Sequence, residues 1–444
     1  PKGGQVVKYG HTIGHATRSI EVGSHVHVHN LISGGTGRML PVCADVLPPP
    51  RSPSIDRPPC ATFLGFRRAD GRVGVRNHIL VLPTVHCVNG VVELIAREVP
   101  EVLAVPHIYG CSHLGNDSVR VRQVLESYAG HPNVGTCLLV GLGCETMSAA
   151  EIADALCKQG AIVECLVVQD EGGTRAAVKR GVDIVRKFLR RVGELQREPI
   201  PVSELVIGVE CGGSDALSGI SANPAVGVAS DLLVSQGGTG IMSEVTEWIG
   251  AEDILVKRAA SQLVGRRIVE AIERRVCAAK ELGVDIRASQ LAPGNIAGGL
   301  TTLEEKSLGA IAKGGTSHVS DFLAYGQRPA ARGLVLMDTP GNDLESVTAM
   351  VAGGAQIILF TTGRGTPIGN PIAPVIKIAS NKAVYNRLED DLDFCAGGVI
   401  KGEPVFVVGQ HIFELLLEVA SGAPTAAERW GYRQFAIELR GPRA

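Results

Sequence analysis

Short apolar runs that end in polar turns recur along the chain. The runs at residues 78–83 and 205–209 and the segment AQIILF predict buried strands. Amphipathic spacing predicts helices near residues 91–98, 175–194, 224–236 and 254–282. Because strand, polar turn and helix alternate, we expect an α/β fold with mainly parallel, doubly wound sheets and reactive groups along one edge.

The pattern divides the chain into four parts. Residues 1–46 form short, turn-bounded segments that cannot bury a core alone, so we expect the last part of a small domain with further sequence upstream. The proline-rich residues 47–61 predict an extended linker. Residues 62–199 and 200–444 predict two α/β domains, of which the second is expected to be catalytic.

Composition narrows the classes of function. The net charge is −2 and the basic residues are scattered, which argues against nucleic-acid or membrane-surface binding. No apolar run approaches the roughly 18 residues of a membrane span, and no signal peptide opens the chain, so we expect a cytoplasmic protein. The 11 cysteines follow no disulfide-framework spacing, which favours reduced thiols, some of them ligands.

The stretch from residue 201 to 227 concentrates candidate chemistry. Its strand would deliver Glu210 and Cys211 at the carboxyl end, where open α/β sheets place their active sites. Gly212 and Gly213 would let the backbone approach a ligand, and Ser214 and Asp215 follow at once. The alternative is a buried cysteine in an ordinary strand-to-helix turn.

Three histidines alternate near the amino end of the chain. His25, His27 and His29 would point to one face if their segment is a strand. Three imidazoles on one face predict either a metal or substrate site or a pH-sensitive surface. Asn30 could hold a neighbouring group in place.

Other polar groups follow the remaining strands or lie on glycine-rich loops. The basic segment after the linker carries Arg67, Arg68, Arg72 and Arg76, which are either carboxylate clamps or part of a solvated loop. The later loop with Thr362 and Arg364 could hold a carboxylate or phosphate. Polar side chains also follow the strands predicted between residues 78 and 145, including Cys87, Asn89, His113, Cys144 and Glu145.

Several motifs occur in an order that resembles the altronate/galactarate dehydratase family. They are RADGRVGVRNHILVLPTVHC, GCSHLGND, GLGCE, ECGGSDALSGISANPAVG, GNIAGGLTTLEEKSLG and TTGRGTPIGNPIAPVIK. HVHVHNL resembles the end of that family's small, β-rich SAF domain. The resemblance implies an iron- or manganese-dependent lyase that dehydrates a sugar acid to a 2-keto-3-deoxy acid. A two-subunit branch that eliminates sulfite from sulfolactate is similar too.

Two ligand sets are open for the metal. His27 and His29 would suit Fe²⁺ or Mn²⁺, because imidazole and carboxylate are ligands of these ions. Cys87, Cys144 and Cys211, each at a strand end, form the alternative, and three converging thiolates would suit an iron–sulfur cluster.

A dehydration reaction would assign a role to each of the candidate residues. Dehydration removes the proton α to a carboxylate and expels a β-hydroxyl with acid assistance. Glu145 and Glu210 are the candidate bases, His27 and His29 are further acid/base candidates, and Ser214 and Asp215 are expected near the substrate hydroxyls. The predicted substrate contacts are Arg72, Arg76 and Arg364 for carboxylates, with Asn89, His113, Asn223, Lys306 and Thr362.

Three hypotheses follow for function. The first is a hydro-lyase acting on a sugar acid of the altronate or galactarate type. The second is sulfite elimination from sulfolactate, and the third is a non-catalytic sugar-acid binding protein on the same scaffold. A small-molecule substrate and a homo-oligomer are the expected partners.

Overall fold

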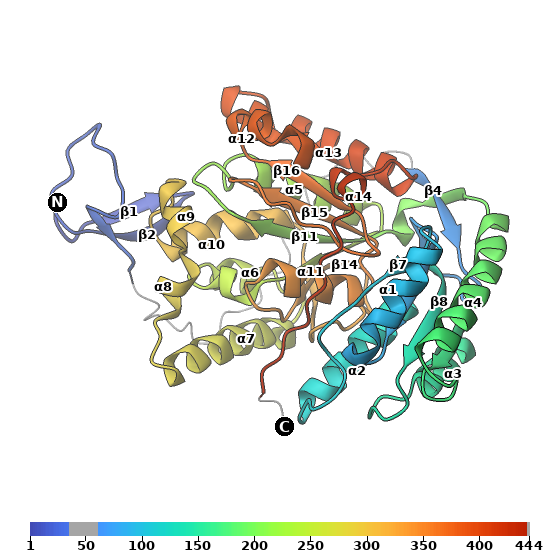
Figure 1. Cartoon of the computed structure of the whole chain (residues 1–444). Coiled ribbons are helices and arrows are strands. Elements are labelled where there is room, and N and C mark those ends of the chain that lie inside the picture. The colour runs from blue at the N-terminus through green and yellow to red at the C-terminus, as the bar shows by residue number, and fades with distance from the viewer. Residues whose placement is uncertain (35–60, 442–444) are drawn as a thin grey trace.

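A computed structural model describes residues 1–34 and 61–441. Within them the chain has two antiparallel sheets of three strands and two parallel sheets of four and seven strands, with helices around them (Figure 1). The predicted α/β fold, with a small β-rich amino-terminal part, is confirmed. The proposed linker and the end of the first predicted domain lie outside the described residues.

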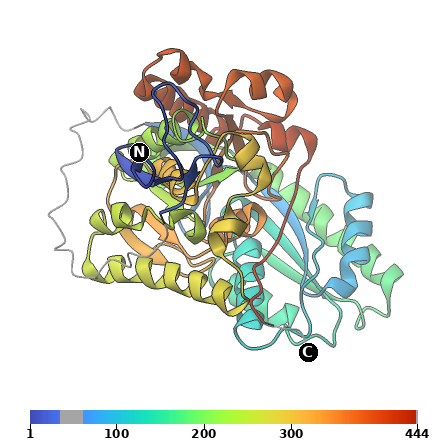
Figure 2. The same ribbon diagram turned by 90° about the vertical axis from the view of Figure 1, so that its left-hand side faces the viewer.

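The amino-terminal sheet packs against the side of the large sheet's domain (Figures 1 and 2). It contains β1 (Gln5–Lys8), β2 (His11–Ala16) and β3 (Leu31–Ile32). Ile13 and Leu31 are buried in the core that this sheet shares with the large sheet. Lys8 pairs with Glu305 of α10 (Leu303–Ile311), and Ser33 donates to Glu304. The small sheet therefore packs against helix α10 and stabilises its position.

The histidines of this region do not form the predicted strand. His25, His27 and His29 lie in a turn before β3. The side chain of Asn30 holds this turn, because its Oδ1 accepts from the His27 backbone N–H (2.8 Å) and its Nδ2 donates to the His25 carbonyl (2.9 Å). The expectation that all three imidazoles alternate along a strand is wrong, because these side-chain bonds replace the ladder that a strand would need.

The four-stranded sheet has the order β7-β6-β8-β9 and is parallel throughout. Its strands are β6 (His78–Pro83), β7 (Leu103–Ala104), β8 (Val134–Gly141) and β9 (Val163–Val167). Its helices are α1 (Asn89–Glu98), α2 (Asn116–Ala129), α3 (Ala149–Lys158) and α4 (Thr174–Glu194). Helices α1 and α4 cover one face, and α2 and α3 cover the other.

The seven-stranded sheet is also parallel and has the order β13-β14-β12-β11-β15-β16-β17. Its strands are β11 (Val206–Gly212), β12 (Thr239–Met242), β13 (Val319–Leu323), β14 (Gly333–Met337), β15 (Ile357–Thr362), β16 (Val375–Ala379) and β17 (Phe394–Cys395). Alternate residues face opposite sides, so Leu359 packs under α5 (Ala222–Ser235) and α13 (Val405–Ala420), whereas Phe360 packs toward α11 (Asp343–Ala352).

The long basic helix predicted at 254–282 is interrupted. The structure has α6 (Glu252–Lys257) and α7 (Gln262–Glu281) instead. At the break, the Arg258 guanidinium donates to the carbonyls of Gly314 and Ser317, and the Ser261 hydroxyl caps α7. Tertiary hydrogen bonds and a capping residue therefore end a helix that periodicity alone would continue.

Shorter elements join the two parallel sheets. The second antiparallel sheet contains β4 (Thr62–Arg67), β5 (Val73–Gly74) and β10 (Glu198–Pro201). The remaining helices are α8 (Ile286–Gln290), α9 (Pro293–Ala297), α12 (Lys382–Arg387) and α14 (Ala426–Trp430). Among the described residues, none of the helices combines the length and apolar character needed to cross a bilayer.

Candidate functional site

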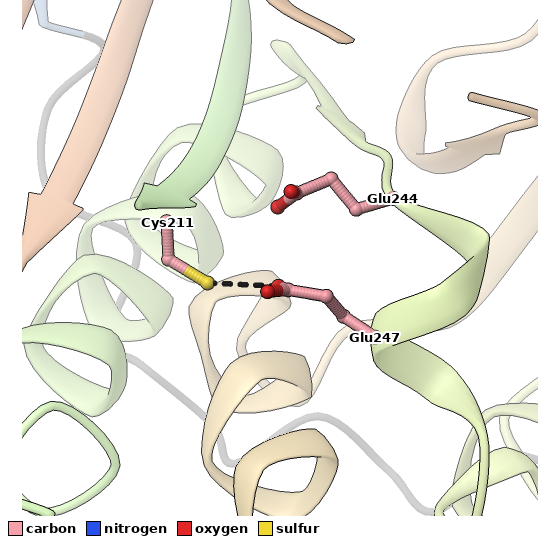
Figure 3. Close-up of side chains that lie close together, drawn as sticks. All are labelled: Cys211, Glu244 and Glu247. Carbon is pink, nitrogen blue, oxygen red and sulfur yellow. Dashed lines mark hydrogen bonds between the residues drawn. The ribbon is translucent and has the colours of Figure 1, made fainter. Parts of the chain in front are cut away.

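A buried cluster of ionisable groups lies at the carboxyl end of β11. The strand ends in Glu210 and Cys211, and Glu244 and Glu247 come from the segment that follows β12 (Figure 3). Lys313 comes from the short helix η4 (Ala312–Gly314), below α5. All five side chains are buried.

Lys313 is the centre of this cluster. Its ammonium donates to Cys211 Sγ at 3.0 Å, to Glu244 Oε2 at 2.9 Å and to Glu247 Oε2 at 3.1 Å. Burial alone would lower the pKa of Lys313, but Cys211 and the surrounding glutamates outweigh it and hold that pKa well above its usual range. Lys313 is therefore a fixed positive charge inside the protein.

The same surroundings shift the pKa values of Cys211 and Glu247 in opposite directions. Burial and the neighbouring Glu247 raise the pKa of the Cys211 thiol, which donates to Glu247 Oε2 at 3.0 Å. Burial would also raise the pKa of Glu247, but Lys313 and Lys306 lower it to about 2. Lys306 lies 3.2 Å from Glu247 Oε1, so the carboxylate has a cation on each side.

A second group of carboxyls surrounds Glu210. Burial raises the pKa of Glu210 to about 7 although Lys313 opposes it, and burial with the charge of Glu247 raises the pKa of Asp343 to about 6. The hydroxyls of Ser243 and Ser346 donate to Glu210 Oε2 at 3.1 and 2.8 Å. Oε1 of Glu210 is buried without a hydrogen-bond partner. Glu210 can therefore hold or release a proton near neutral pH.

These raised pKa values predict a pH-dependent stability. A carboxyl whose pKa is higher in the folded state binds more protons there than in the unfolded chain, so the free energy of unfolding falls as pH rises from about 4.5 to about 7. We expect Glu210 to contribute roughly 3 kcal/mol to this fall. Urea titrations of the wild type and of Glu210→Gln over this pH range would test it, since the variant should show a shallower fall. Equal slopes would contradict the assignment.

Glu244 adopts a strained backbone conformation at the site. Its φ of +71° lies in the left-handed region, which non-glycine residues seldom occupy. The Thr339 hydroxyl accepts from the Glu244 N–H at 2.8 Å and holds it there. Strain of this kind is concentrated at functional sites, and here it turns the Glu244 carboxylate toward Lys313.

The donor atoms of the cluster fit a cation. Within the described chain, Cys211, Glu244 and Glu247 each offer one atom, all within 4.8 Å of one another, and Glu210, Glu244 and Asp343 do the same. In the first group the ammonium of Lys313 already takes the cation's place. A thiolate with two carboxylates suits Fe²⁺ or Mn²⁺. Burial raises the pKa values of Cys211 and Glu244 well above their usual range, so an ion could bind here only if the Lys313 ammonium moved aside and these two groups lost their protons.

Ser214, Asp215 and Asn223 hold the loops above the cluster. Oδ1 of Asp215 accepts from the Ser218 N–H (2.8 Å) and from the Ser380 hydroxyl (3.0 Å), and the Ser214 carbonyl accepts from Asn295. Asn223 donates to the Gly309 carbonyl. The Gly363 N–H, after β15, also donates to the Gly213 carbonyl at 3.2 Å, so the loops that follow β11, β15 and β16 are tied together at one edge of the sheet.

Gly213 and Arg364 lie on the outer surface of this edge, with Thr362 packed behind them. Gly213 has φ +60° and is exposed, and a Cβ there would lie 3.4 Å from Thr362 Oγ1 and 3.6 Å from Arg364 Cβ. Arg364 is exposed, whereas Thr362 is buried and its Oγ1 accepts from the Gly365 N–H. The edge therefore presents a guanidinium beside an open stretch of backbone.

Two predicted arginine clamps have protein partners elsewhere. Arg72 lies 2.6 Å from Asp70 Oδ2. Arg76 binds Glu428 through two nitrogens and also donates to the carbonyls of Val419 and Ala423. These bonds join the first α/β domain to the carboxyl-terminal segment, so the observed role of Arg76 is structural.

The remaining predicted residues lie on the amino-terminal turn or the four-stranded sheet. Cys87 and Cys144 follow β6 and β8, so the predicted set with Cys211 is divided between two sheets. Glu145 accepts from the Thr84 hydroxyl and from the N–H groups of Leu142 and Gly143; burial would raise its pKa, but these bonds lower it. Asn89 donates to the His107 carbonyl, and His113 accepts from the Gly110 N–H.

The three histidines of the amino-terminal turn lie close together. The ring of His25 stacks on that of His27, with ring centroids 5.3 Å apart, and its centroid lies 6.2 Å from that of His29.

Sequence reasoning missed the residues around Cys211 as a group. Glu244 and Glu247 are three positions apart after a strand, a spacing that could have marked them as neighbours on one turn. Lys313 carries no such signal, because a lone lysine after a helix usually faces solvent. Its burial becomes visible only when η4 is placed beneath β11 and β12.

Comparison with known proteins agrees with this arrangement. Three family models match in order: the altronate/galactarate dehydratase SAF domain over residues 1–34, the D-galactarate dehydratase/altronate hydrolase second domain over 65–193, and the D-galactarate/altronate dehydratase C-terminal domain over 202–442.

Curated relatives share most of the chain's length. An altronate dehydratase of Bacillus subtilis is 40% identical over 98% of this chain and 88% of its own length. A galactarate dehydratase (L-threo-forming) of Escherichia coli is 37% identical over 98% of this chain and 87% of its own length. The (2R)-sulfolactate sulfo-lyase subunit beta of Chromohalobacter salexigens is 36% identical over 85% of this chain and 97% of its own length. The chain therefore belongs to the altronate/galactarate dehydratase family, whose dehydratase members are hydro-lyases.

Proposed function

We propose that this protein dehydrates a sugar acid of the altronate or galactarate type to a 2-keto-3-deoxy acid. The observation that carries the proposal is the buried group of Glu210, Cys211, Glu244, Glu247 and Lys313 at the carboxyl edge of the large sheet. It combines a carboxyl with a pKa of about 7 with fixed positive charge, and elimination beside a carboxylate needs both.

The roles follow from the pKa values and positions. Glu210 takes the proton α to the substrate carboxylate, because its pKa of about 7 suits a general base. Glu210 then gives this proton to the departing β-hydroxyl, which leaves as water as the C–O bond breaks, and the resulting enol tautomerises to the keto acid. Lys306 and Arg364 bind the carboxylates, because both cations lie toward the outer side of the cluster. Ser214 and Asp215 position the loop that faces the hydroxyls.

We also propose that Cys211, Glu244 and Glu247 hold Fe²⁺ or Mn²⁺ in the working enzyme. Such an ion would supply Lewis-acid stabilisation of the charge that develops on the carboxylate. The histidine turn at His27 and His29 remains the alternative ligand set. A homo-oligomer and a cytoplasmic location remain predictions.

Product analysis tests the reaction. Protein purified without oxygen and supplied with Fe²⁺ or Mn²⁺ would be incubated with altronate, galactarate and (2R)-sulfolactate. A 2-keto-3-deoxy acid from either sugar acid would support the proposal. Sulfite release from sulfolactate alone would favour the second candidate, which the 36% identity to a sulfo-lyase subunit supports. Binding of a sugar acid without formation of any product would favour the third hypothesis, a non-catalytic binding protein.

Arg364 is expected to act in substrate binding. Arg364→Ala should raise KM by about tenfold with little change in kcat, because a carboxylate loses one charge-assisted contact in ground and transition state alike. Arg387→Ala, at the end of α12, is a matched control that should leave both parameters unchanged. A fall in kcat with unchanged KM would contradict this role.

A further inference from the structure

A second group of polar side chains lies outside the Cys211 cluster, on the four-stranded sheet. Cys87 follows β6, Cys111 follows β7 and Cys144 follows β8. These strands are adjacent and parallel, with β6 between the other two. Because the carboxyl ends of parallel strands share one edge of a sheet, the three thiols are delivered to the same edge.

Backbone contacts bring the three loops together at this edge. The His86 N–H donates to the Tyr109 carbonyl at 2.8 Å, which places the residues before Cys87 beside those before Cys111. A Cβ on Gly110 would lie only 2.6 Å from the Cα of Val85, so these two loops are in close contact. On the other side, the Thr84 hydroxyl donates to Glu145 at 2.8 Å and ties the β6 loop to the loop of Cys144.

The three thiols lie at or near the surface of this edge. Cys87 and Cys144 are exposed and Cys111 is half-buried. Because their loops are held together, a cofactor could reach all three thiols from solvent.

The loops that carry these cysteines are strained next to the sulfurs. Ser112 has φ +65°, a left-handed conformation in a residue other than glycine. Gly110 and Gly143, beside Cys111 and Cys144, also have positive φ, at +131° and +120°. Backbone in such conformations persists where the surrounding structure fixes it, and it is concentrated at ligand sites.

The spacing of the sulfurs separates two kinds of metal centre. A zinc ion with Zn–S bonds of 2.3 Å requires sulfurs about 3.8 Å apart. Within the described residues, Cys87, Cys111 and Cys144 are not among the groups of three whose ligand atoms all lie within 4.8 Å. An iron–sulfur cluster binds each thiolate through a different iron and so accepts more widely spaced sulfurs.

We propose that Cys87, Cys111 and Cys144 hold an iron–sulfur cluster at the carboxyl edge of the four-stranded sheet. Each thiol loses its proton as its sulfur–iron bond forms. Three cysteines leave one iron of a four-iron cluster to a ligand other than cysteine. The centre is separate from the Cys211 cluster, because that group lies on the other parallel sheet.

Anaerobic reconstitution of the full chain tests the proposal. Equal amounts of ferrous and ferric iron with sulfide supply the cluster without a further oxidant. The wild type is expected to retain iron and acid-labile sulfide in equal amounts after desalting, with the broad visible absorbance of such clusters. Cys111→Ser and Cys144→Ser should lose all three signals.

Two matched variants complete the design. Cys277→Ser removes an exposed thiol on α7, and Cys211→Ser removes the buried thiol of the large sheet; both should retain the cluster. Circular dichroism checks that each variant is folded, and the exposed position of Cys144 makes its serine variant well tolerated. The readout does not depend on turnover, so its outcome is independent of the proposed dehydratase activity.

Three results would overturn the proposal. They are a wild type that binds no sulfide, zinc bound without sulfide at these thiols, and a cluster that survives in Cys111→Ser and Cys144→Ser. Alkylation gives a second readout: Cys87 and Cys144 should be protected in the reconstituted protein, while Cys277 reacts as before. Unchanged alkylation of Cys87 and Cys144 would also contradict it.

Discussion

Glu210→Gln is expected to lower kcat/KM by about 10²-fold or more, because general base catalysis typically contributes that much. The substitution keeps the shape of a buried side chain and its contacts with Ser243 and Ser346, but it removes the group whose pKa is about 7. Steady-state kinetics on a confirmed substrate would measure the effect, and the pH–rate profile should lose its acidic limb near pH 7.

The matched control for this variant is Glu270→Gln on the exposed side of α7. It makes the same chemical change far from the cluster and should leave kcat/KM within about twofold, as surface substitutions usually do. If Glu210→Gln retained wild-type kcat/KM with an unchanged pH profile, Glu210 would not be the base.

Lys313→Met is expected to destabilise the fold by about 3–5 kcal/mol, the usual cost of leaving a buried charge without its partner. The methionine fills a similar volume, but Glu247, Glu244 and Cys211 lose the ammonium that they share. Urea unfolding at pH 7 would measure the loss. Lys158→Met, which breaks an exposed pair with Asp154, should leave stability almost unchanged, because solvent screens such a pair.

The same variant tests the cation site. If Cys211, Glu244 and Glu247 bind a divalent ion, removing the competing ammonium should increase their affinity for Mn²⁺. Added Mn²⁺ should then restore part of the lost stability of Lys313→Met, because a ligand that binds only the folded state stabilises it by mass action. If Mn²⁺ restored none of the lost stability, these three residues would not be the metal site, and the histidine turn would become the favoured ligand set.

The sequence was a good guide to the parts of the fold that depend on local periodicity. The strand at 78–83 and the helix near 175–194 follow apolar spacing, and the structure has β6 (His78–Pro83) and α4 (Thr174–Glu194) there. It failed where side-chain hydrogen bonds decide the backbone. Asn30 turns the segment of His25, His27 and His29 out of a strand, and no periodicity encodes that bond.

The candidate site was predicted only in part, for a similar reason. Glu210 and Cys211 could be placed because strand ends are visible in the sequence. Their partners Glu247 and Lys313 come from segments 36 and 102 residues away from Cys211 along the chain, and only the order of strands in the sheet brings them together. Arg76 was predicted to bind substrate for the same reason. Its ion-pair partner Glu428 is 352 residues away along the chain, so nothing in the sequence indicated this structural role.

The apolar layer beneath α11 has a consequence for motion. Leu80 and Leu139 of the four-stranded sheet belong to the same continuous core as Met350 of α11 and Phe360 of the seven-stranded sheet. Two units that share one close-packed core cannot separate by a hinge motion without exposing that core to water. We therefore expect them to melt in a single cooperative transition. We also expect substrate to be admitted by rearrangement of the edge loops, with no hinge between the two sheets.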